Sequence, residues 1–189
     1  SVGAMIGATR SGVVGVPTLV TSWTDFINKF ANGLDTPFIS TSYLPYAVYG
    51  FFVNGGKQLY ISRVAHSTKA KATKEGTNLT VTAKNEGTWG NELKVTIVKN
   101  EDWVTDTNEE FDVVIELGSS ASSTIKSVFT DTIVDAILSD SKASQWIGSV
   151  SLNIETSVAL TEETITLAGG VDGISDLIDA DYVDALSTF

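Results

Sequence analysis

The stretch that decides the fold is YLPYAVYGFFVNGGKQLYISRV, residues 43–64. Its first half is apolar nearly all round, with Pro45 where a first helical turn tolerates proline and Asn54-Gly55-Gly56 where the helix ends. Its second half, Gln58 to Val64, has the alternation and the branched side chains of a strand. The stretch therefore predicts a helix that is buried on most sides or kept for a partner, followed by a strand of an α/β layer.

The residues before this stretch predict one more strand and one more helix. The opening SVGAMIGA, residues 1–8, alternates apolar with small side chains, which is typical of a strand packed closely on both sides. The helix begins after the N-cap Ser22, has Asp25 in the capping-box position and ends at Asn32-Gly33. The residues with the spacing of its buried face are Trp23, Phe26, Ile27 and Phe30. The order strand, helix, helix, strand outlines an α/β layer with its helices on the sheet.

The composition changes at Ala65, after which Thr, Ser and Lys are abundant and apolar residues alternate strictly. This pattern predicts a separate β-rich domain with a half-buried antiparallel sheet. We expect one helix there, with its apolar face running from Ile125 to Ile137, and a Gly-rich turn around Trp89. The expected strands of this domain cover residues 79–83, 93–97, 111–117, 146–154 and 163–167.

A last helix closes the chain and is expected to pack back onto the first layer. The residues on its predicted buried face are Ile174, Leu177, Ile178, Tyr182, Ala185 and Leu186. The predicted fold class is therefore α+β: an α/β core layer (strand-helix-helix-strand plus the C-terminal helix) with an inserted β-rich domain. The core layer comprises residues 1–65 with 167–189, and the inserted domain comprises residues 66–166.

Composition and charge exclude several classes of function. The 189 residues include no cysteine and one histidine, which excludes disulfides, thiolate metal sites and multi-histidine zinc sites. Residues 101–189 hold two lysines against 18 acidic residues and account for the net charge of −11. This imbalance argues against contact of nucleic acid or an anionic membrane with the acidic part, and we expect no nucleic-acid partner. No run reaches the ~18 apolar residues of a membrane span, so we expect no membrane insertion.

Three patterns resemble functional sites, but each lacks residues that such a site requires. GATRSG, residues 7–12, has the spacing of a phosphate-binding loop, but Val13 and Val14 stand where Lys and Ser or Thr are required. His66 has neither an acid nor a nucleophile near it in sequence and is interpreted as a polar surface group. Five aspartates near the end match no EF-hand register, so they are assigned to the helix dipole and to solvent. They are Asp172, Asp176, Asp179, Asp181 and Asp184. We predict no catalytic, cofactor-binding or metal-binding residue, no cofactor and no enzymatic activity.

Two further features concern processing. Asn78-Leu79-Thr80 spells a glycosylation sequon, but no signal peptide supports a secreted route. The chain opens inside a predicted strand and stops just after a predicted helix. We therefore expect it to be a fragment of a longer polypeptide.

Four segments, in order, resemble the N-terminal half of contractile tail sheath proteins, the family found in phages, phage-like bacteriocins and related injection machines. They are SVGAMIGATRSGVVGVPTLVTSW (1–23), YAVYGFFVNGGKQLYISRV (46–64), AKNEGTWGNELKV (83–95) and LAGGVDG (167–173). Similar features of the family are a small-residue strand before an aromatic helix, an Asn-Gly-Gly turn before a strand ending in Arg-Val, and a Gly-Trp-Gly-Asn turn. Residues 100–160 carry little that matches.

The resemblance implies a structural protein whose subunits stack as hexameric rings around a tail tube and contract once to drive the tube through a target envelope. It implies tube and baseplate proteins as further partners, a virion tail or phage-like particle as the location, and assembly in the bacterial cytoplasm. It also implies that the inserted domain faces outward. Family subunits are joined by terminal extensions that add strands to neighbours. This chain lacks the N-terminal arm and the C-terminal half, so we expect a monomeric, assembly-incompetent fragment.

Two other functions remain open from the residues. Thr-rich alternating strands and an acidic balance are also common in cell-surface or adhesive binding modules. An enzyme, such as a glycan hydrolase with two acids about 5–10 Å apart, ranks third because the sequence nominates no such pair.

Overall fold

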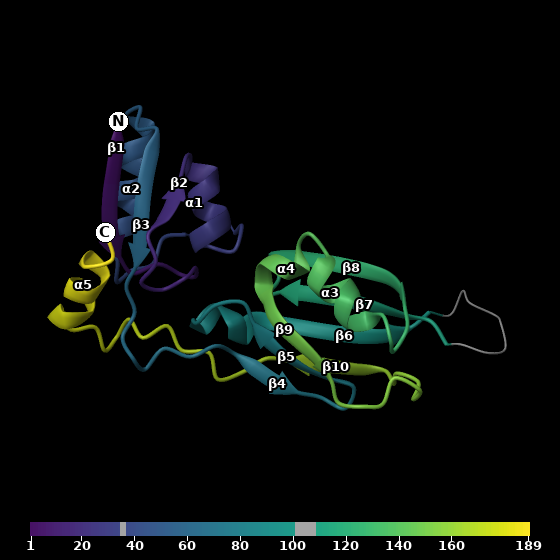
Figure 1. Cartoon of the computed structure of the whole chain (residues 1–189). Helices are drawn as coiled ribbons and strands as arrows, with labels where there is room; N and C mark the ends of the chain where they lie inside the picture. The colour runs from purple at the N-terminus through teal and green to yellow at the C-terminus, as the bar shows by residue number, and fades with distance from the viewer. Residues whose placement is uncertain (35–36, 101–108) are drawn as a thin grey trace. The chain divides into compact units, whose positions relative to one another are not determined.

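The computed structural model describes residues 1–34, 37–100 and 109–189 and divides into two compact units (Figure 1). Unit 1 comprises Ser1–Ala70 and Val171–Phe189, and unit 2 comprises Lys71–Gly170. Both helices and sheets are present, which confirms the predicted α+β class. Within the described ranges, no helix is both long enough and apolar enough to cross a membrane.

Unit 1 is built on a three-stranded sheet in the order β1-β3-β2. β1 (Val2–Gly7) and β3 (Gln58–Arg63), both predicted from the sequence, run parallel with Val2 opposite Gln58. β2 (Thr18–Val20) pairs antiparallel with the other side of β3. The sequence prediction missed β2 because three residues are too few to show an alternation.

Helices α1 (Trp23–Phe30) and α2 (Leu44–Val53) cover one face of this sheet. Ser22 caps α1 as predicted, since its Oγ accepts a hydrogen bond from the backbone N–H of Asp25 at 3.0 Å. The Asp25 carboxylate accepts the backbone N–H of Thr21 at 3.0 Å, one residue earlier than a capping box requires. The buried core between helices and sheet is formed by Val20, Phe26, Phe30, Leu44, Val48, Leu59 and Ile61.

α5 (Asp179–Leu186) packs on part of the opposite face of the sheet, and just beyond its end the Thr188 hydroxyl oxygen lies 3.3 Å from that of Ser62. The prediction that β1 packs closely on both sides is wrong, because Val2 is 68% exposed on this face. The predicted helix over 174–186 is too long, and Ala185 is the buried residue of α5. Ile178, Tyr182 and Leu186, expected to be buried, are exposed.

Unit 2 contains two antiparallel sheets where one was predicted. The larger has the order β10-β6-β7-β8, from β6 (Leu93–Lys99), β7 (Phe111–Leu117), β8 (Ala121–Val128) and β10 (Glu163–Thr166). The smaller has the order β4-β5-β9, from β4 (Thr73–Glu75), β5 (Leu79–Ala83) and β9 (Ile147–Leu152). Alternate residues of β5, β6 and β7 are buried, as their sequence pattern predicts.

The helix predicted from Ile125 to Ile137 is wrong in its first half. Residues up to Val128 form β8, which pairs with β7, and α3 is the short helix Ile133–Ser139. Half-buried and exposed residues alternate along most of β8, and pairing with β7 overrides the helical spacing. α4 (Ala143–Trp146), which was not predicted, follows α3 and leads directly into β9.

The predicted Gly-rich turn is the 3-10 helix η1 (Thr88–Glu92), with Trp89 buried at its centre. The Asn91 side chain holds the distant segment around Gly170, since it accepts that residue's N–H at 2.7 Å and donates to its carbonyl at 3.0 Å. A Cβ on Gly170 would lie 2.4 Å from the carbonyl oxygen of Gly87. Two of the segments that carry the resemblance therefore meet inside unit 2. The acidic stretch at 100–109 lies largely outside the described residues.

Candidate interaction surface

α2 presents an apolar side to solvent as well as to the core. Leu44 and Val48 face the sheet and are buried, whereas Tyr46, Tyr49 and Val53 point away from it at helical spacing and are exposed. Burial on most sides, the first of the two sequence interpretations, is therefore wrong. The second interpretation, a helix kept for a partner, stays a prediction, and the exposed apolar face is compatible with it.

The exposed face of α2 continues into an aromatic cluster that includes α1. Trp23 stacks on Phe38 with ring centroids 5.6 Å apart and meets the edge of Tyr49 at 5.1 Å. Phe38 in turn lies 4.5 Å from the ring of Tyr46. We call Phe38, Tyr43, Tyr46, Tyr49 and Val53 the α2 surface; these residues are between 42% and 90% exposed. No charged residue occurs in residues 37–56, which contain this surface.

A second apolar surface lies on α5, on the other side of the same sheet. We call Ile178, Tyr182, Val183, Leu186 and Phe189 the α5 surface; these residues are between 40% and 63% exposed. Unlike the α2 surface, this one is accompanied by carboxylates, because α5 contains Asp179, Asp181 and Asp184. Unit 1 therefore exposes apolar residues on both outer layers, which is unusual for a surface with no partner.

His66 is not the isolated surface group that the sequence indicated. Its Nδ1 lies 2.9 Å from the Asp181 carboxylate, which comes from α5 and is 115 residues away in sequence. Asp181 also accepts the backbone N–H of Ile178 at 2.9 Å. Two hydrogen bonds hold the pKa of the Asp181 carboxyl below its usual value: the bond from the Ile178 N–H has the larger effect, and the bond from His66 has the smaller one. The His66–Asp181 pair joins α5 to the segment that follows β3.

The loop with phosphate-loop spacing is packed against its own unit. The Ser11 N–H donates to the carbonyl of Phe30 at 3.0 Å, and the buried Arg63 donates from a terminal nitrogen to the carbonyl of Gly12 at 2.7 Å. A Cβ on Gly12 would lie 2.6 Å from the Phe30 ring. These contacts turn the loop toward α1 and β3, which explains its glycines by packing.

Two more of the aspartates near the end of the chain each have a hydrogen-bond partner of their own. Asp172 accepts the N–H of Ile174 at 3.1 Å, and Asp176 accepts the Thr68 hydroxyl at 2.7 Å. Asp172 and Asp176 precede α5, so the prediction that they stand at a helix start is wrong. No three acidic, His or Cys side chains gather as a possible metal site in the described ranges.

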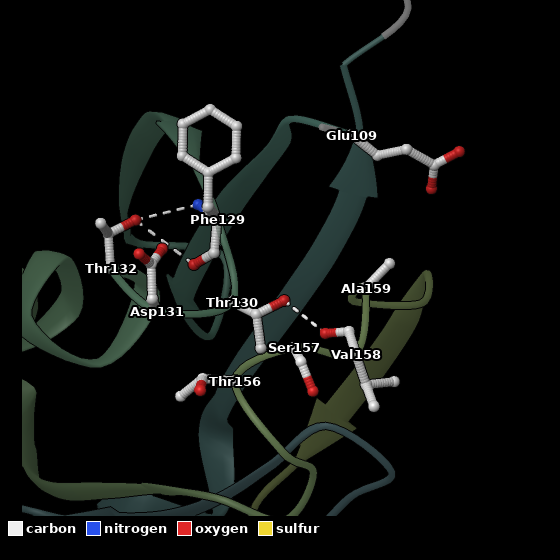
Figure 2. A pocket seen from close by; sticks show the side chains of 9 residues that line it. All are labelled: Glu109, Phe129, Thr130, Asp131, Thr132, Thr156, Ser157, Val158 and Ala159. Atoms are coloured by element: carbon white, nitrogen blue, oxygen red, sulfur yellow. Dashed lines mark hydrogen bonds between the residues drawn. The ribbon is translucent and has the colours of Figure 1, made fainter. Parts of the chain in front are cut away.

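Unit 2 has a hollow of about 400 Å³ lined by the segment after β8, by residues 156–159 and by Glu109 (Figure 2). Two of its hydroxyl groups form hydrogen bonds with the backbone: Thr130 donates to the carbonyl of Val158 at 2.7 Å, and the Thr132 Oγ1 accepts the N–H of Phe129 at 2.9 Å. The lining also contains two carboxylates, Glu109 and Asp131, and no histidine or lysine among the described residues.

The sequon asparagine is structural. Asn78 is 1% exposed, and its amide donates to the Thr161 carbonyl and the Glu163 carboxylate at 2.8 and 2.7 Å. Its Oδ1 accepts the Thr161 N–H at 3.0 Å. Because the amide nitrogen is buried and bonded, the folded chain does not offer it for glycosylation.

No protein-family model matches the chain, and no curated protein matches it in sequence. Among solved structures, the sheath tail protein of Desulfitobacterium hafniense superposes with a TM-score of 0.64 at 23% identity, covering 98% of this chain and 38% of that one. The chain has a sheath-like fold. The sheath tail protein of Listeria innocua has the same fold, with a TM-score of 0.61 at 20% identity over 99% of this chain and 37% of its own. The sheath-like fold described here thus spans less than two fifths of either solved chain.

Proposed function

We propose that the chain is part of a contractile tail sheath subunit that polymerises as rings around a tail tube and contracts to drive the tube through a target envelope. The observation that carries the proposal is the sheath-like fold, which matches along 98–99% of the chain and includes both units. A structural role also agrees with the apolar surfaces of unit 1, since a lattice subunit needs faces that bind its neighbours.

The proposal includes partners and a location. The partners are other sheath subunits in hexameric rings, the tail tube and the baseplate, in a phage tail or phage-like particle assembled in the bacterial cytoplasm. Unit 2, with 7 basic and 16 acidic residues, is proposed as the outward-facing domain. Such a charge keeps the exposed domain soluble and away from anionic surfaces. The 189-residue chain alone is proposed to be monomeric, because it spans only 37–38% of the solved sheath tail proteins.

Immunogold electron microscopy of producing cells and their lysates tests this function. Antibodies against residues 71–170 should decorate striated tubes along their whole length, in both long and shortened forms. Decoration of the cell envelope without tubes would reject the sheath function and support the adhesive binding module instead. An unrelated antibody on the same grids controls for background labelling.

A further inference from the structure

We propose that the α2 surface of one copy binds the α5 surface of the next copy, so that unit 1 associates head to tail. This inference rests on the proposed assembly function and assigns its contact residues. The two surfaces belong to one compact unit: α1 and α2 pack on the face of β3 that carries Leu59 and Ile61, and α5 packs on the face that carries Ser62. Two different surfaces on opposite faces give a heterologous contact, which continues into rings or filaments.

The chemistry of the two surfaces is complementary. The α2 surface offers the phenol O–H groups of Tyr43, Tyr46 and Tyr49 as hydrogen-bond donors and has no charge. The α5 surface is flanked by the exposed carboxylates of Asp179 and Asp184, which only accept. Pairing α5 with α5 would bring aspartates of like charge together, whereas pairing α5 with α2 gives the carboxylates donors.

The exposed area of the α2 surface is too small for a stable contact between two free chains. With about 150–250 Å² for a whole aromatic side chain, the exposed parts of the α2 surface sum to roughly 500–600 Å². A stable pairwise interface buries about 800 Å² per partner. The contact is therefore weak between two free chains and becomes effective when each copy makes it twice and makes further contacts in a lattice.

Disulfide trapping tests the pairing, because the chain has no cysteine of its own. Two proteins are made, Ala47→Cys on α2 and Ala180→Cys on α5; both alanines are exposed, and neither substitution removes an apolar residue of either surface. The two are mixed at equal concentration, oxidised briefly and resolved by mass. Random collision at equal concentration gives about twice as much mixed disulfide as either homodimer, and a preferred encounter should raise this ratio to about fivefold or more.

Two controls make the result specific. Ser119→Cys, an exposed turn residue of unit 2, replaces Ala47→Cys and should give only the collisional yield. Tyr43→Glu on the Ala47→Cys protein adds a carboxylate where the partner has aspartates, and it should remove the excess without altering the circular dichroism spectrum. Tyr43 is 90% exposed, so the substitution leaves the core untouched.

A collisional yield of the mixed product, or homodimers in excess, would overturn the pairing. The outcomes also separate this inference from the sheath function. Tubes in cells without preferred trapping would leave the function standing and reject the pairing of these surfaces. Preferred trapping without tubes would leave the pairing standing and reject the sheath.

Discussion

Asn78 joins the two sheets of unit 2, and replacing it tests the account of that unit. It lies between β4 and β5 of the smaller sheet, and its partners Thr161 and Glu163 lead into β10 of the larger one. Its side chain makes two donor bonds and accepts from both the N–H and the hydroxyl of Thr161, at 3.0 and 3.2 Å. Asn78→Ala removes all four bonds at a site that is 1% exposed.

The magnitude follows from these bonds. A net contribution of about 1 kcal/mol per bond, partly offset by relaxation around a small cavity, gives a loss of roughly 3 kcal/mol in the free energy of unfolding of unit 2. With a urea dependence of about 2 kcal/mol per molar, the midpoint should fall by about 1.5 M. Asn153→Ala is the matched control, because its amide bonds to Gly76 and Thr80 are exposed and should be worth under about 1 kcal/mol.

Asn78→Asp sharpens the test by adding a pH dependence. It places a carboxylate oxygen where the amide nitrogen now lies 2.7 Å from the Glu163 carboxylate. Two adjacent carboxylates cannot both ionise easily, so one of their pKa values rises in the folded variant. A raised folded pKa costs stability at pH values above the unfolded pKa, and this cost disappears as the pH falls. The variant should be less stable than Asn78→Ala at pH 7 and should recover toward pH 4.

Urea unfolding followed by far-UV circular dichroism and tryptophan fluorescence measures these differences, with unit 2 and unit 1 fitted as separate transitions. A loss below about 1 kcal/mol for Asn78→Ala would refute the reasoning that a buried bonded amide couples the two sheets. An Asn78→Asp deficit that does not change between pH 7 and pH 4 would refute the placement of Glu163 beside it.

Three further predictions follow from single residues. Gly170→Ala should lower the free energy of unfolding by about 2 kcal/mol or more in thermal unfolding, because the new Cβ would lie 2.4 Å from a backbone oxygen. The matched control is the neighbouring Gly169→Ala, where a Cβ meets open space. Its loss should be about 1 kcal/mol, because only the φ of +78° disfavours alanine there. Phe30→Ala, at the centre of the unit 1 core, should cost about 3–5 kcal/mol in urea unfolding, and a loss below 1 kcal/mol would contradict the assigned core. The depressed pKa of Asp181 adds stability at pH values above its unfolded pKa, and this stability is lost as the pH falls through the folded value. The protection factors of the α5 amides, which compare each exchange rate with the intrinsic rate at the same pH, should therefore fall on acidification in the wild type and change little with pH in Asp181→Asn.

Much of the fold was predictable because several segments carry complete local signals. The α1 signal has a start at Ser22, a buried stripe and an end at Asn32-Gly33, and the structure follows it. The alternating strands β5, β6 and β7 were likewise found within about two residues. The prediction failed for elements whose secondary structure depends on a partner strand elsewhere in the fold. β8 carries a helical spacing, yet it pairs with β7.

The sequence predicted only part of the candidate surfaces. The all-round apolar character of α2 indicated either burial or a partner, and only the position of the sheet shows that Tyr46 and Tyr49 point outward. The His66–Asp181 pair was missed because 115 residues separate its members, and no local pattern links them. Three residues of the α5 surface, Ile178, Tyr182 and Leu186, were predicted to be buried, because spacing shows which residues share a side of a helix but not what covers that side.

Electron microscopy of the purified product of the gene that encodes these residues tests the central claim most directly. The sheath account predicts hollow, transversely striated tubes with six-fold end views, and density for the two-unit fold within each subunit. Dispersed particles, or fibres attached to the cell surface with no hollow tube, would contradict it.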